Sequence, residues 1–95
     1  MIEAATVGVG SSNNRLKQFT VRFPVPFPVI PVVVANALQS EGYQAGSISD
    51  TFAVTVTSVS LNGFTANIYR VDSTVSGWGQ NLFLGYIAMS PEVKL

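Results

Sequence analysis

The chain contains no cysteine and no histidine among its 95 residues. Without thiols and imidazoles, the usual zinc and copper ligands are missing, and so are the nucleophile–base pairs of most hydrolases. No disulfide can form, so cysteine usage does not indicate a redox compartment. We therefore expect a domain that is not an enzyme and that needs neither a metal nor a cofactor.

Charge is also scarce. Charged residues make up 11% of the chain, whereas a soluble domain usually carries roughly a quarter. The five cations are scattered, which argues against nucleic acid as a partner. The five carboxylates are equally dispersed and give no signal for the paired acids of a glycosidase. A hydrophobic share of 47% with so little charge favours burial of a second surface in an oligomer.

Long apolar runs are absent as well. No stretch approaches the roughly twenty residues of a membrane helix. The first residues lack the basic-then-apolar pattern of a secretory signal. We therefore expect no insertion into a membrane.

The pattern that is present has a period of two, which is typical of β-strands. Four prolines between Pro24 and Pro31 exclude both a helix and a central strand from that segment. Asn62-Gly63 is a strong hairpin signal between two alternating runs. These signals predict one all-β domain over residues 1–95, a small six-stranded antiparallel β-sandwich in which residues 1–15 form an N-terminal strand and loop extension. The expected strands lie within residues 1–9, 19–23, 32–38, 52–59, 64–68 and 82–89.

Two of these strands are apolar on both faces, at Val32–Leu38 and Leu82–Met89. Alternate side chains of a strand point in opposite directions, so one sandwich core cannot cover both faces. A partner chain is expected on the second face, and closed cyclic association would supply it.

Polar loops are expected at residues 39–51 and 72–80. The second loop carries Trp78 between Gly77 and Gly79. Trp78 is interpreted either as a platform on which a ligand stacks or as an anchor tucked into a neighbouring protomer.

Four motifs follow one another at a characteristic spacing. They are Phe19-Thr20-Val21-Arg22-Phe23, then Pro31-Val32-Val33-Val34 after Phe27, then the hairpin from Val54 to Phe64, and finally Tyr86-Ile87-Ala88. This succession resembles the H-type lectin domain over about residues 19–89. The resemblance implies a trimer that binds sugar, typically N-acetylgalactosamine, in clefts between neighbouring protomers.

The sugar-binding residues of that family transfer poorly to this chain. The family's loop glycine and aspartate fall at Gly10 and Ser12, and its arginine falls at Thr51. Its Trp-His pair falls at Val71-Asp72, and its tyrosine falls at Gln80. Only the glycine is retained, so the family's sugar specificity is not carried over.

A rebuilt sugar site would combine planar polar groups with an aromatic ring. The candidate carbohydrate-binding residues are Ser12, Asp50, Thr51, Arg70, Asp72, Trp78 and Gln80. Asp50 and Asp72 also suit turn-capping roles, and Arg70 also suits an ion pair.

The leading hypothesis is a lectin-like receptor-recognition or attachment module that gains avidity as a trimer, with a cell-surface glycan as its ligand. The alternative is a structural trimerisation or capping domain of a fibre or virion-type assembly, with no small-molecule ligand. A glycosidase accessory is a third hypothesis. Low charge and richness in Ser, Thr, Gly and Asn favour an extracellular or virion-associated location.

Overall fold

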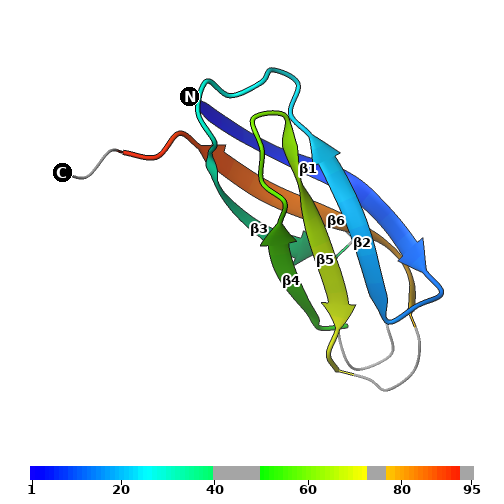
Figure 1. Ribbon diagram of the computed structural model, residues 1–95. Coiled ribbons are helices and arrows are strands. Elements are labelled where there is room, and N and C mark those ends of the chain that lie inside the picture. Colours follow the sequence, from blue (N-terminus) through cyan, green and yellow to red (C-terminus); the bar gives the residue numbers. More distant parts are fainter. Residues whose placement is uncertain (40–49, 73–76, 93–95) are drawn as a thin grey trace.

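The computed structural model describes residues 1–39, 50–72 and 77–92, which form two packed antiparallel sheets of three strands each (Figure 1). The strands are β1 (Ile2–Ser12), β2 (Leu16–Arg22), β3 (Val32–Leu38), β4 (Phe52–Thr57), β5 (Gly63–Arg70) and β6 (Trp78–Met89). Sheet A has the order β1-β6-β3 and sheet B the order β2-β5-β4. The predicted six-stranded all-β fold is confirmed. Over the described ranges, no helix is long and apolar enough to cross a membrane.

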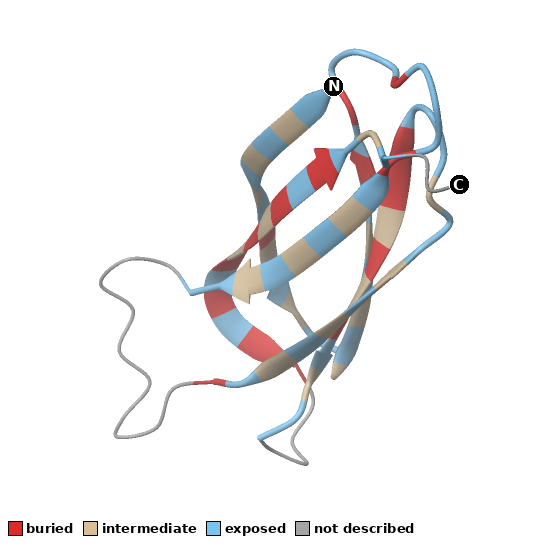
Figure 2. Ribbon diagram, turned by 90° about the vertical axis from the view of Figure 1, so that its left-hand side faces the viewer, coloured by how far each residue is buried: buried red, intermediate tan, exposed pale blue. Residues whose placement is uncertain are grey.

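The core lies between the two sheets and is built from every second residue of each strand, as the banding in Figure 2 shows. An aromatic cluster fills one part of it. The ring of Phe23 contacts that of Phe27 edge-on, with centroids 4.9 Å apart, and Phe64 meets Tyr86 at 5.2 Å. The alternation predicted for β4 is also observed, because its inward residues pack against this core.

The proline-rich segment between β2 and β3 carries the chain from sheet B to sheet A without forming a strand, as predicted. The backbone N–H of Phe23 donates to the carbonyl of Asn62, and that of Phe27 donates to the carbonyl of Leu61, at 2.8 Å each. The crossing segment therefore holds the β4–β5 turn in place.

The β4–β5 hairpin pairs as predicted, but its connection is longer than a two-residue Asn-Gly turn. Strand β4 ends at Thr57, and the chain turns through residues 58–62 with Ser58 at φ 54°. Ser58, which was expected to lie in the strand, is thus the start of the turn. Gly63 opens β5 where a Cβ would lie 2.0 Å from the carbonyl oxygen of Val21, so no larger residue fits.

The N-terminal segment is part of the sandwich and not an extension of it. Strand β1 pairs along β6 from Ile2 opposite Met89 to Ser12 opposite Trp78. The prediction that a polar loop begins at Gly10 is wrong for residues 10–12, which still belong to β1. The strand continues because the register with β6 shifts near Gly10, which has φ 81°. Most of the loop predicted over residues 39–51 lies outside the described residues.

Candidate functional site

Arg70, the last residue of β5, forms hydrogen bonds to residues next to the start of β4 and the start of β6, at one end of the sandwich. Its NH2 group donates to Asp50 Oδ1 at 2.9 Å, and its Nε donates to Asp72 Oδ1 at 3.1 Å. Its NH1 group donates to the carbonyl of Gly77 at 2.9 Å. One guanidinium therefore ties together segments that lie before β4, after β5 and before β6. We call Asp50, Thr51, Arg70, Asp72 and Gln80 the Arg70 cluster.

The inner part of the Arg70 cluster is a buried carboxylate. Asp50 is 8% exposed, and its second oxygen accepts a hydrogen bond of 2.8 Å from the Nε2 of Gln80, which is 2% exposed. Both carboxylate oxygens are thus paired, as a buried charge requires. The Oε1 of Gln80 is buried and has no hydrogen-bond partner in the described structure.

The outer part of the Arg70 cluster is accessible. Asp72 and Thr51 are exposed, and 18% of the Arg70 side chain is exposed. The hydrogen bonds from Arg70 and from the backbone N–H of Thr51, the latter at 2.9 Å, lower the pKa of Asp72 to about 2. Asp72 is therefore ionised at any physiological pH. Its oxygens can still accept hydrogen bonds from a ligand's hydroxyl groups.

The position found for Trp78 corrects both roles expected from the sequence. Trp78 is not in a loop but begins β6, and only 4% of it is exposed. Its ring packs edge-on against Phe52 at 5.0 Å, and its Nε1 donates to the carbonyl of Gly10 at 2.9 Å. A ring buried in its own protomer is available neither to stack on a sugar nor to enter a neighbour.

The backbone conformation of Gly77 explains how Trp78 can be buried although the residues around it are polar. Gly77 has φ 72°, and a Cβ there would lie 2.0 Å from the carbonyl oxygen of Ser12. The chain can therefore pass against the end of β1 and turn Trp78 inward only with glycine at this position.

Ser12 is the one remaining candidate. Its hydroxyl donates to the carbonyl of Asn14 at 2.8 Å and accepts from the N–H of Asn14 at 3.0 Å. It therefore stabilises the β1–β2 turn, at a distance from the Arg70 cluster.

Sequence reasoning missed Arg15, whose Nε donates to the carbonyl of Arg70 at 2.9 Å and whose guanidinium lies over the ring of Tyr69. The register of β2 on β5, which pairs Leu16 with Tyr69, is the signal that places Arg15 there.

Within residues 1–39, 50–72 and 77–92, no three acidic side chains are grouped so that they could hold a metal ion. At the opposite end of the sandwich, Glu3 accepts a hydrogen bond of 3.5 Å from the hydroxyl of Tyr86. Burial, together with the Glu3 charge, raises the pKa of Tyr86.

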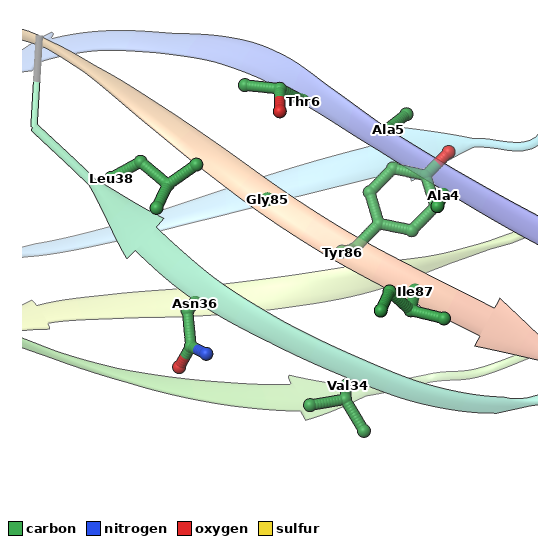
Figure 3. Close-up of a pocket in the computed structure, with 9 residues that line it drawn as sticks. All are labelled: Ala4, Ala5, Thr6, Val34, Asn36, Leu38, Gly85, Tyr86 and Ile87. Carbon is green, nitrogen blue, oxygen red and sulfur yellow. The ribbon is translucent and has the colours of Figure 1, made fainter. Parts of the chain in front are cut away.

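The outer face of sheet A, which points away from the core, carries no charged side chain on any of its three described strands. Its side chains lie in rows across the sheet, and Ile2, Val34 and Ile87 are 67%, 61% and 48% exposed. A hollow of about 460 Å³ runs over this face between β1, β6 and β3 (Figure 3). The outward residues are Ile2, Ala4, Thr6, Gly8, Val32, Val34, Asn36, Leu38, Gly79, Asn81, Phe83, Gly85, Ile87 and Met89.

The outer face of sheet B has the opposite chemistry. Its centre is polar, with the amide of Gln18 donating to Asn67 at 3.1 Å across β2 and β5. Thr20 lies opposite Thr65 in the next row. Such a face is stable in water, whereas the apolar face of sheet A is not expected to stay uncovered.

The chain is an all-β sandwich of two three-stranded sheets with a polar cluster at one end. The family model of the H-type lectin domain matches residues 18–89, so the chain belongs to this family. No curated protein matches the chain in sequence.

Two solved structures are similar to the chain. The tailspike of Pseudomonas phage phi297 matches with a TM-score of 0.73 and 18% identity, over 98% of this chain and 16% of the tailspike. An N-truncated R1-type pyocin tail fibre matches with a TM-score of 0.72 and 25% identity, over 95% of this chain and 70% of the fibre fragment. The chain therefore corresponds to a small part of the tailspike and to most of the fibre fragment.

Proposed function

We propose that this domain is a carbohydrate-binding attachment module that acts as a homotrimer in a virion-associated or extracellular fibre. The observation that carries glycan binding is the convergence of Arg70, Asp72 and Thr51 at an accessible end of a lectin-family sandwich. A guanidinium, a carboxylate and a hydroxyl are the groups that select among the hydroxyl patterns of a sugar.

Within this proposal, the residues of the cluster have different roles. Asp72 and Thr51 contact the sugar directly, since both are exposed. Asp50 and Gln80 act as positioning residues, because their contacts fix the guanidinium from the buried side. Stacking on Trp78 has no part in it, so the affinity of one site is expected to be weak, and three sites on one particle provide avidity.

The trimer is supported by the outer face of sheet A. A second copy of this chain is the proposed occupant, because the face is apolar and uncharged on all three strands, whereas the face of sheet B is polar. The low charge of the chain as a whole agrees with burial of a second surface. Likeness to a tailspike and a tail fibre supports assembly in a fibre.

One observation favours the structural alternative. The Arg70 guanidinium and both aspartates are already paired with each other, so the cluster would also serve as a lock that closes the end of a capping domain with no ligand. A lock and a binding site differ in one measurable respect, because only a binding site retains a soluble saccharide.

The experiment is a glycan-array screen of the purified domain, followed by titration of the best saccharide. Asp72→Asn is expected to abolish binding while the oligomer and the fold remain. Glu3→Gln is the matched control, because it removes a carboxylate at a distance from the cluster. An array with no bound glycan would favour the structural alternative. Asp72→Asn binding that equals the unmutated chain would instead show that the sugar binds outside the Arg70 cluster.

A further inference from the structure

A second polar hollow lies at the opposite end of the sandwich from the Arg70 cluster. It has a volume of about 280 Å³ and is formed by the end of β2, the β4–β5 turn and the start of β5. Its polar lining comes from Thr20, Arg22, Ser58, Ser60, Asn62 and Thr65. The volume is just below the roughly 300–1,000 Å³ of sites for drug-sized ligands, so it suits a single sugar ring.

The charge in this hollow has one sign. Among the described residues that line the hollow, Arg22 is the one that carries a charge. Arg22 is exposed, and its guanidinium has no hydrogen bond or ion pair to the residues that the structure describes. The guanidinium of Arg70, in contrast, is neutralised by two aspartates. The N–H groups of the Arg22 guanidinium are therefore available to form two parallel hydrogen bonds to one anion.

The backbone around the hollow is held in place before any ligand arrives. The Ser60 hydroxyl accepts from the N–H of Asn62 at 3.1 Å and donates to the carbonyl of Gly63 at 3.3 Å. Ser58 keeps a left-handed φ of 54°, which is unusual for a residue other than glycine. Such strained conformations gather at ligand-binding positions. A rigid wall lowers the entropic cost of binding.

We propose that this hollow is a second saccharide site, separate from the Arg70 cluster, and that it takes a sugar unit bearing a carboxylate, such as a uronic acid. Arg22 pairs with the carboxylate. The hydroxyls of Ser58 and Thr20 and the amide of Asn62 bind the ring hydroxyls. The aromatic residue of the lining, Phe64, is 2% exposed and offers no stacking surface, so the affinity depends on charge and falls as salt rises.

The test is titration of the full chain with glucuronate, with glucose as the neutral match and acetate as the carboxylate without a sugar ring. Glucuronate is expected to bind more tightly than either and to shift the amide resonances of Ser58, Asn62 and Gly63. Arg22→Gln is expected to weaken glucuronate binding by about tenfold or more, and Arg22→Lys by less, because lysine keeps the charge and loses the bidentate geometry.

Two outcomes of the acetate and Arg22 titrations would overturn the proposal. One is acetate binding as tightly as glucuronate, which would make Arg22 a contact for any anion. The other is unchanged glucuronate affinity in Arg22→Gln. Asp72→Asn separates this site from the first, because it should leave glucuronate binding intact. If Asp72→Asn abolished that binding, the acidic sugar would belong to the Arg70 cluster, and only the second site would be refuted.

Discussion

The Nε2 of Gln80 donates a hydrogen bond of 2.8 Å to the Oδ2 of Asp50, and both residues are buried. Gln80 belongs to β6, the central strand of sheet A, whereas Asp50 precedes β4 of sheet B. The bond therefore joins the two sheets at the end where Arg70 also binds Asp50. A charge buried at this junction makes the cluster a determinant of stability as well as a candidate ligand site.

Asp50→Ala is expected to destabilise the fold. The substitution leaves the Arg70 guanidinium without its inner partner and the Gln80 amide without an acceptor. The expected loss is roughly 3 kcal/mol, the scale for breaking a buried pair by removing one partner. Urea unfolding at a fixed protomer concentration measures it. Glu3→Gln, which removes a carboxylate outside the cluster, should change the unfolding free energy far less.

The lowered pKa of Asp72 makes stability fall in acid. Its folded value of about 2 lies below the ordinary value of 3.8, so the unfolded chain binds the proton more readily. The contribution of Asp72 is therefore complete above about pH 4 and is lost as the pH falls toward about 2. Urea midpoints across this range should decline less steeply in Asp72→Asn than in the unmutated chain. Parallel declines in the two proteins would contradict this assignment.

Much of the fold could be predicted because its signals are local. The bounds of β3 follow from an apolar run that starts directly after Pro31 and ends before a polar stretch. The start of β6 was missed because Gly77, Gly79 and the polar residues around them have the composition of a loop. What turns that segment into a strand is contact with Ser12, which is distant in sequence.

The candidate site was predicted in membership but not in its contacts. The family alignment and loop composition selected five residues that the structure brings together, from Asp50 to Gln80. That they bind one another depends on how β4, β5 and β6 begin and end at one edge of the sandwich, which no local pattern specifies. Trp78 was misplaced for the same reason, since its burial follows from pairing with β1.

The proposed trimer predicts that a lysine introduced on the outer face of sheet A disrupts the assembly, whereas a lysine on the outer face of sheet B does not. Ile87→Lys places a charge on the apolar face of sheet A, and burying it in an interface would cost on the order of several kcal/mol. Thr55→Lys places the same charge on the exposed face of sheet B. Sedimentation should show a trimer for the unmutated chain and Thr55→Lys, and a folded monomer for Ile87→Lys. If the unmutated chain sediments as a monomer at every concentration tested, the trimer proposal is wrong.

Trp78→Ala is expected to destabilise the protomer itself, since the ring is enclosed by its own chain and packs on Phe52. Removal of a buried tryptophan costs roughly 3–5 kcal/mol through the cavity it leaves. Trp78→Phe keeps most of the ring volume but loses the hydrogen bond to Gly10. The lost hydrogen bond should lower the free energy of unfolding by about 1 kcal/mol, in addition to any loss from the smaller ring.

These two variants distinguish a core role from a role at the surface. Under conditions where Trp78→Phe remains folded, it should keep both the trimer and glycan binding, because Trp78 touches neither a neighbour nor a sugar. Thermal unfolding, sedimentation and the glycan screen on the same preparation decide the matter. If Trp78→Phe unfolds like the unmutated chain yet fails to bind glycan, the ring contacts the ligand after all, and the buried position described for it does not hold in the bound state.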